Sequence, residues 1–330
     1  MKAVRTNFVF SIMVSLCFLF AFAGAAPTVK AQGKTTIRIG SPFKPGTIVV
    51  DAAEKFKELV EKESAGRIEV TIDAGNKAEI EINKMNRTGE LEMQSNGTNF
   101  LELYAPPYYF FTAPYVMKDF DHYMRVWNGK LGLQARAQLE KNDLKYLATI
   151  YRGLRQMTTN KPVYTPADVY NLKLRLPPIA TWMAVWKAMG TDPVGVPLPE
   201  LFDSLKTGKA ESSEGDLPQI AGFKLFQVQS HLIITNHLVQ TAGILIHKPF
   251  FDKLSKADQD LIVKAGKEVE EWANNKIKTD EPATLVNLQR QGMQVVIPNA
   301  DAFRTKAKSA VDELFKTQWP VTTWAEVLDQ

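Results

Sequence analysis

Apolar and polar positions alternate between strand and helix patterns from residue 36 onward. Residues 36–40 and 68–72 alternate side chains as half-buried strands do, and residues 49–63 between them place Phe56 and Val60 on one helical face. Further strands are predicted at 91–95, 146–151, 172–176, 194–196, 210–214, 231–235, 243–247 and 293–297. Further helices are predicted at 80–86, 120–127, 131–141, 181–189, 200–207 and 301–315. This mixture of strands and helices predicts an α/β protein.

The longest helical pattern lies in the last third of the chain. Ser255 and Asp258 are spaced as in a capping box, and the apolar period that follows continues to about Gln291. Pro282 lies inside this span, so we expect a kink or a break there. The strands predicted at 231–235 and 243–247 are separated by polar residues, which favours two strands rather than one.

The first 31 residues have the layout of a secretory signal peptide. Lys2 and Arg5 precede an apolar run over 8–26, and small residues follow, with a cleavage site expected after Ala31. A membrane anchor is the alternative, because the run is almost long enough to cross a bilayer. With Lys30, the leader holds three basic and no acidic residues, so its removal brings the formal charge of +4 close to neutral. We therefore expect an exported protein.

Composition narrows the class of protein further. The 330 residues are 45% hydrophobic and 23% charged, which is typical of a globular protein and excludes collagen, coiled coil and disorder. A chain this long favours two lobes. Cys17 is the single cysteine, the four histidines leave little for a metal site, and no basic run predicts nucleic-acid binding. Phosphate-loop, dinucleotide and nucleophile-elbow motifs are missing from the sequence, so no cofactor is expected.

Arg175 is the strongest candidate for binding chemistry. It stands near the C-terminal end of the strand predicted at 172–176, just before Pro177 and Pro178. Ligands of open α/β sheets bind at that edge, and an arginine there can grip a carboxylate with two hydrogen bonds. The alternative is an exposed arginine in a surface ion pair, which would contribute little.

Five short motifs occur in a specific order around Arg175. They are Gly153-Leu154-Arg155-Gln156-Met157-Thr158, Lys173-Leu174-Arg175, a proline-rich loop with Glu200 and Phe202, Leu205-Lys206-Thr207-Gly208, and a strand carrying Glu214. In this order the chain resembles the solute-binding proteins of tripartite ATP-independent periplasmic (TRAP) transporters, of the DctP-like type. The resemblance extends over most of the chain after the leader.

The resemblance implies an α/β periplasmic-binding-protein-like type II fold with two lobes, hinge-crossing segments and a long C-terminal helix. Lobe I would combine 32–152 with 241–280, and lobe II would combine 153–240 with 281–330. The lobes would close on a small organic carboxylate, which is then delivered to a sodium-coupled membrane permease. On this reading the protein is not an enzyme.

The resemblance also assigns roles to individual residues. Arg175 takes the place of the carboxylate-binding arginine and Arg155 that of a second arginine, although an ion pair at the lobe junction would also explain Arg155. Asn96 falls where some members place a polar side chain against the ligand. The position of His237 is a family feature that we interpret as structural.

Other residues are candidates because of their place in the chain. Trp182 could stack on a ligand, and Leu198 and Phe202 could form apolar walls. Glu214 and Asp216 follow a strand expected near Arg175, so they could accept a ligand hydroxyl, bind an ammonium or orient Arg175. A stabilising ion pair is their alternative role.

The sequence departs from the sialic-acid-binding members of the family. Gly215 and Pro178 stand where those members carry asparagines, so sialic acid is not the expected ligand. Two other functions stay open: an exported hydrolase that uses Glu214 and Asp216, and a binding protein of an ATP-driven importer.

Overall fold

The computed structural model describes residues 34–330, which form one compact unit. The predicted signal peptide and its cleavage site after Ala31 lie outside the described residues. No helix in the described part of the chain is long and apolar enough to cross a membrane.

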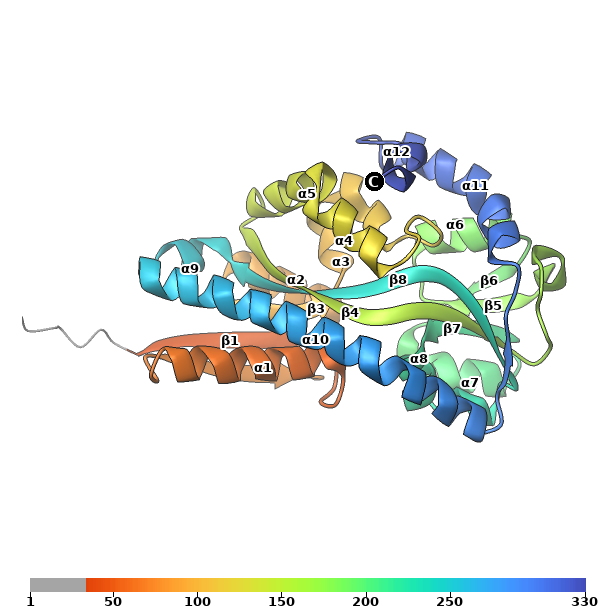
Figure 1. Ribbon diagram of the computed structural model, residues 1–330, viewed down its shortest axis with the longest axis horizontal. Coiled ribbons are helices and arrows are strands. Elements are labelled where there is room, and N and C mark those ends of the chain that lie inside the picture. Colours follow the sequence, from red (N-terminus) through yellow and green to blue (C-terminus); the bar gives the residue numbers. More distant parts are fainter. Residues whose placement is uncertain (1–33) are drawn as a thin grey trace, which may run out of the picture. The chain divides into compact units, whose positions relative to one another are not determined.

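Nine strands of the described chain form a single mixed sheet, drawn in Figure 1. Its order is β2-β1-β3-β8-β4-β7-β5-β6, and β9 pairs with one end of β8. The strands are β1 (Thr35–Ser41), β2 (Ile68–Ala74), β3 (Met93–Gly97), β4 (Leu144–Thr159), β5 (Lys173–Leu176), β6 (Asp192–Gly195), β7 (Ser212–Asp216), β8 (His231–His247) and β9 (Gln294–Val296). This architecture confirms the predicted α/β class.

Helices pack against this sheet and form its hydrophobic cores. The α-helices are α1 (Ile48–Glu63), α2 (Glu79–Thr88), α3 (Asn99–Tyr104), α4 (Phe120–Asn128), α5 (Lys130–Glu140), α6 (Ala180–Ala188), α7 (Leu201–Lys206), α8 (Leu217–Gly222), α9 (Lys248–Asp252), α10 (Lys256–Arg290), α11 (Ala300–Thr317) and α12 (Trp324–Leu328). The 3-10 helices are η1 (Pro106–Thr112), η2 (Pro166–Val169), η3 (Leu198–Glu200) and η4 (Leu225–Gln227). One core joins α1 and α10 to the sheet, a second joins α7 and α8 to it, and the largest gathers the aromatic residues around η1, α4, α6 and α11.

Two long antiparallel strands, β4 and β8, connect the two ends of the sheet. They pair from Leu144 and His247 to Thr159 and His231, with three register shifts along the way. On one side β8 pairs with β3, and on the other β4 pairs with β7. Figure 1 shows the two strands side by side through the middle of the molecule.

The prediction of two separate strands at 231–235 and 243–247 was wrong, because one strand, β8, covers both. The strand predicted at 146–151 is confirmed as part of β4, which continues to Thr159. Residues 238–242 continue β8 and pair with β4, for example Gln240 with Gly153. The polar side chains that suggested a loop, Gln240 and Thr241, are buried and make hydrogen bonds in the interior. Polarity here marks buried hydrogen bonding rather than a turn.

The chain does not break at Pro282, because α10 continues through it over 35 residues. A kink there stays a prediction. The Ser255 side chain accepts a hydrogen bond from the Asp258 amide and caps the helix as predicted. Pro282 is exposed, so water can satisfy the carbonyl one turn earlier that the missing amide leaves free. The helix packs on α1 and β4 near its start and on α8 near its end.

Each predicted lobe crossing, near 152, 240 and 280, falls inside one continuous element: β4, β8 or α10. The division into lobes itself stays a prediction.

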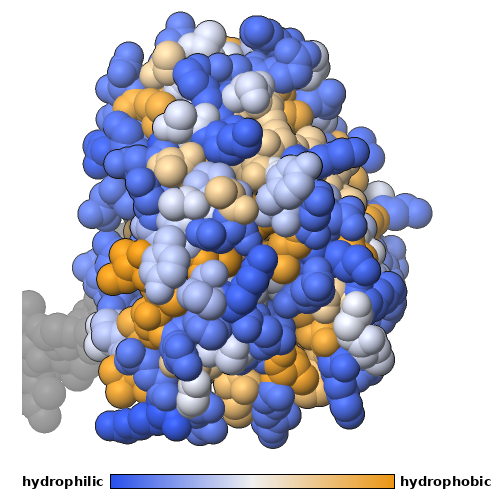
Figure 2. All heavy atoms as spheres, turned by 90° about the vertical axis from the view of Figure 1, so that its right-hand side faces the viewer, coloured by the Kyte–Doolittle hydropathy of each residue, from blue (hydrophilic) through white to orange (hydrophobic). Residues whose placement is uncertain are grey.

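Figure 2 shows the face of the molecule on the side where Figure 1 labels β6, and apolar residues there are interspersed with polar ones.

Candidate functional site

Arg175 lies in β5, the short strand that pairs with β6 and β7. The neighbouring Leu174 and Leu176 are fully buried in the aromatic core, because alternate side chains of a strand point to opposite faces. Arg175 itself is only 1% exposed. Its Nε and Nη2 donate to the carbonyl oxygen of Val196 at 2.9 and 2.6 Å. The strand therefore holds a guanidinium in the interior on the face opposite the leucines.

The positive charge of Arg175 has no carboxylate partner within the described chain. Its guanidinium forms no salt bridge there, and its two hydrogen bonds both go to a neutral carbonyl. Burial lowers the pKa of Arg175 to about 10, while the negative charge of Glu214 raises it and the positive charge of Arg155 lowers it further. A buried guanidinium with an uncompensated charge is ready to accept an anion.

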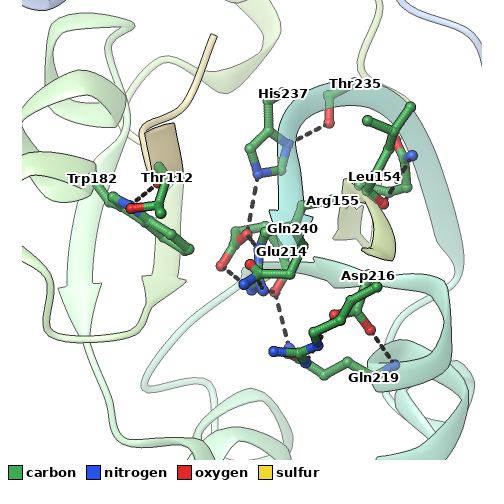
Figure 3. Close-up of polar contacts among 12 residues, drawn as sticks. Thr112, Leu154, Arg155, Trp182, Glu214, Asp216, Gln219, Thr235, His237 and Gln240 are labelled. Atoms are coloured by element: carbon green, nitrogen blue, oxygen red, sulfur yellow. Dashed lines mark hydrogen bonds and ion pairs between the residues drawn. The ribbon is translucent and has the colours of Figure 1, made fainter. Parts of the chain in front are cut away.

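Arg155 presents the opposite case, because its charge is fully matched. Its guanidinium grips the Glu214 carboxylate through Nε and Nη2, the latter at 2.8 Å from Oε1, and Nη1 donates to Gln240 Oε1 at 3.0 Å. Figure 3 shows Glu214 beside Arg155 and His237, with Gln240 close to the same guanidinium. Burial alone would raise the pKa of Glu214, but Arg155 and His237 outweigh it and lower that pKa to about 2.

His237 completes this buried cluster. Its Nε2 lies 3.1 Å from Glu214 Oε2 and its Nδ1 lies 2.8 Å from Thr235 Oγ1. Burial lowers the pKa of His237 even though Glu214 opposes the change, so the imidazole is neutral near pH 7. In that form Nε2–H donates to the carboxylate and Nδ1 accepts from the threonine hydroxyl. The predicted structural role of His237 agrees with these contacts.

Trp182 supports the cluster from α6. Its ring lies under the Arg155 guanidinium, with 5.1 Å from the guanidinium carbon to the ring centroid, and its Nε1 donates to the Thr112 carbonyl at 2.8 Å. The side chain is 4% exposed. The structure therefore places Trp182 against an arginine, and its predicted stacking on a ligand stays a prediction.

Asp216 has two local partners. Its Oδ1 accepts from the Gln219 amide at 2.8 Å and so caps α8, and its Oδ2 lies 3.1 Å from Arg152 Nη2. The Arg152 guanidinium also stacks over the ring of Phe43, 4.7 Å from its centroid. Asp216 thus fastens the start of α8 to β4.

The remaining predicted residues lie apart from these contacts. Asn96, in β3, is buried. Its Nδ2 donates to the Gln94 side chain and the Glu79 carbonyl, and its Oδ1 accepts from the Gly97 backbone amide. Leu198 is 37% exposed in η3, and Phe202 packs on the core of α7 and α8. The structure therefore brings together Arg155, Glu214 and Trp182, with Arg175 and Asp216 near enough for their charges to act on the cluster.

Sequence reasoning missed several partners. Gln240 and Arg152 were not singled out, although each holds one of the named charged residues. Gln219 was also missed: a side chain added at Gly215 would start 2.5 Å from Gln219 Nε2, so this carboxamide fills the space beside the glycine. The spacing of Thr235 and His237, two apart on one strand, is a signal that could have indicated their contact.

The described residues contain no group of three or more side chains suited to a metal ion. The arrangement instead offers hydrogen-bond donors and one unmatched positive charge, which suits the binding of an organic anion.

Comparison with known proteins gives a consistent result over most of the chain. A family model described as "Bacterial extracellular solute-binding protein, family 7" (DctP) matches residues 39–318. The sialic acid-binding periplasmic protein SiaP of Vibrio cholerae is 28% identical over 295 residues, which cover 88% of this chain and 90% of that protein. The 2,3-diketo-L-gulonate-binding periplasmic protein YiaO of Escherichia coli is 27% identical over 308 residues, covering 92% of this chain and 93% of that protein.

Solved structures are also similar to this chain over most of its length. A TRAP periplasmic solute-binding protein from Polaromonas, solved with bound D-erythronate, has a TM-score of 0.80 and 26% identity, covering 89% of this chain and 98% of that one. A protein of the same kind from Roseobacter denitrificans, solved with L-galactonate, has a TM-score of 0.77 and 26% identity, covering 90% and 99%. The fold of this chain is therefore that of the TRAP solute-binding proteins.

Proposed function

This chain belongs to family 7 of the bacterial extracellular solute-binding proteins, and from that premise we propose that it is the receptor of a TRAP transporter. It captures a small organic carboxylate outside the cytoplasm and delivers it to a sodium-coupled membrane permease. The protein acts by binding alone, without a cofactor.

The observation that carries this proposal is the unmatched charge of Arg175. A carboxylate that reaches the guanidinium would supply the missing counter-ion and accept charge-assisted hydrogen bonds, each worth about 1.5–3 kcal/mol. The ligands named for the structurally similar proteins, D-erythronate and L-galactonate, each carry one carboxylate. Arg175 is accordingly the residue that we assign to the ligand carboxylate.

Arg155, Glu214 and Asp216 hold the binding surface rather than anchor the carboxylate. The two carboxylates are already engaged, Glu214 by Arg155 and His237 and Asp216 by Arg152. The Arg155 guanidinium also lies over the Trp182 ring, and a contact of Arg155 with the ligand stays a prediction. Asn96, Leu198 and Phe202 remain candidates for the walls of the site.

Closure of two lobes would trap the anion. In this proposal lobe I is 32–152 with 241–280 and lobe II is 153–240 with 281–330, and β4, β8 and α10 carry the bending at the three crossings. The leader, residues 1–31, directs export to the periplasm and is cleaved after Ala31.

A hydrolase based on Glu214 and Asp216 is the second candidate, and the geometry disfavours it. A general acid needs a raised pKa and a free proton, whereas the pKa of Glu214 is lowered to about 2 and its oxygens are bonded to Arg155 and His237. Incubation of the protein with a bound acid, followed by mass spectrometry of the acid, separates the two functions. A receptor returns its ligand unchanged. A partner permease in the same operon separates the TRAP receptor from a binding protein of an ATP-driven importer.

A thermal-shift screen of organic acids tests the proposal directly. Ligand at about 100 times its dissociation constant adds roughly 2.7 kcal/mol of stability. For a chain of this length each kcal/mol raises the Tm by about 2–4 °C, so a saturating ligand should raise the Tm by several degrees. A broad set of carboxylates that leaves the Tm unchanged would contradict the proposed function.

A further inference from the structure

The charged groups around Arg175 balance except for a single positive charge. Arg155 pairs with Glu214 and Arg152 pairs with Asp216, at 2.8 and 3.1 Å for Nη2–Oε1 and Nη2–Oδ2. All four side chains are largely buried, with Arg152 the most exposed at 16%. Arg175 is the fifth charged group and has no partner among residues 34–330.

Two further acidic groups lie next to this set. Glu79 Oε1 accepts from the Asn99 amide at 3.3 Å, and Glu281 Oε1 accepts from the Leu154 amide at 3.4 Å. Burial raises the pKa of both carboxyl groups, and the Asp216 charge raises that of Glu281 further. Two more carboxyl groups, those of Glu79 and Glu281, therefore lie near the part of β4 that carries Arg152 and Arg155.

Positive groups other than these three arginines have little effect here. Arg152 lowers the pKa of Glu79 and Arg155 lowers that of Glu214. Within residues 34–330, Glu214 pairs with Arg155 and His237 and forms no salt bridge with a lysine. His237 is neutral near pH 7, because burial lowers its pKa. The site thus has capacity for one negative charge.

We propose that the ligand carries one carboxylate and no second anionic group. This inference rests on the proposed function and narrows its substrate class to monocarboxylates, such as hydroxylated or keto acids whose remaining groups are uncharged. One carboxylate matches the charge of Arg175 and leaves the ligand together with these three arginines, Glu214 and Asp216 without net charge. A second carboxylate would be desolvated beside Glu214 and Asp216 with both nearby arginines already paired.

Matched pairs of acids test the inference whichever acid is the natural ligand. Each pair differs only by the replacement of a neutral end group by a carboxylate: D-erythronate and meso-tartrate, D-galactonate and galactarate, D-gluconate and D-glucarate, succinamate and succinate. Calorimetric titration of the exported protein gives the dissociation constant of every member. We expect at least one monocarboxylate to bind and its dicarboxylate partner to bind on the order of 100-fold more weakly or worse.

Repeating the titrations at a lower pH separates the effect of the second charge of a dicarboxylate from the effect of its size. A second carboxyl group of an ordinary acid gains its proton near a pH of about 4–5, so lowering the pH from about 7 to about 5 should strengthen dicarboxylate binding and leave monocarboxylate binding nearly unchanged. Equal pH dependence in both members of a pair would overturn the inference.

The outcomes also separate this inference from the proposed function. A dicarboxylate that binds as tightly as its monocarboxylate partner at neutral pH overturns the inference and leaves the receptor intact. Failure of every carboxylate in the panel and in the wider screen contradicts the proposed function itself.

Discussion

Replacement of Arg175 by methionine should abolish ligand binding and leave the fold nearly as stable as before. Methionine keeps the length and apolar stem of the side chain but removes the guanidinium. The loss of two hydrogen bonds leaves the Val196 carbonyl without these donors, which costs about 1–3 kcal/mol. Removal of the buried charge acts in the opposite direction.

The magnitude of that second effect follows from the pKa. A pKa of about 10 in place of the usual 12.5 corresponds to roughly 3 kcal/mol by which burial disfavours the charged form. This cost is present at all pH values below about 10 and is relieved only as the pH rises above it. The two effects nearly cancel, so the free energy of unfolding of Arg175→Met should lie within about 1–2 kcal/mol of the wild-type value.

Binding should respond far more strongly. Two charge-assisted hydrogen bonds of about 1.5–3 kcal/mol each are lost, so the dissociation constant should rise on the order of 100-fold or more. Isothermal titration with an acid identified in the screen gives the affinity, and urea unfolding gives the stability.

Arg155→Met is the matched control for this experiment. It leaves Glu214 buried without its main partner, so we expect a loss of stability of about 3–5 kcal/mol. The two variants should therefore show opposite patterns: Arg175→Met loses binding, whereas Arg155→Met loses stability. A folded Arg175→Met protein that binds the acid with unchanged affinity would refute the reasoning.

Three further predictions concern acid stability, packing and export. The pKa of Glu214 lies near 2 against the usual 4.5, so its contribution of about 3 kcal/mol is complete above about pH 4.5 and is lost as the pH falls toward 2. In urea unfolding, Glu214→Gln should reduce the fall of the free energy of unfolding between about pH 4.5 and 2. An unchanged fall would show that other groups cause it. Gly132→Ala places its Cβ 1.7 Å from the Trp127 carbonyl oxygen and should destabilise the protein by several kcal/mol, about 2–4. Gly222→Ala meets no atom within 4 Å and should change the unfolding midpoint little; equal midpoints for both variants would contradict the packing argument. N-terminal sequencing of the exported protein should begin after Ala31, and a chain that keeps residue 1 would favour the membrane anchor instead.

Local patterns predicted much of the fold because most elements have a clear apolar face. Residues 49–63 and 255–258 gave the helix starts and faces that α1 and α10 show. The same logic failed along β8, where Gln240 and Thr241 looked like loop residues. Their partners lie far away in the sequence, on β4 and α4, so no local pattern indicates that they are buried.

The sequence predicted the main charged residue of the candidate site, Arg175, but not which charged residues around it form ion pairs. Arg175 stood out because it lies at a strand end before two prolines, the edge where open sheets bind ligands, and the structure places it in the interior. Which arginine Glu214 contacts could not be read from the sequence, because it depends on the register of β7 with β4. That register sets Met157 opposite Glu214 and places Arg155 beside it. The ligand contacts of Trp182, Asn96, Leu198 and Phe202 stay predictions.

A crystal structure of the protein with a bound acid from the screen tests the central claim most directly. The account predicts a ligand carboxylate within about 2.7–2.9 Å of the Arg175 guanidinium, with the Arg155–Glu214 pair still intact. A bound acid whose carboxylate lies on other residues, with Arg175 still bonded only to Val196, would contradict it.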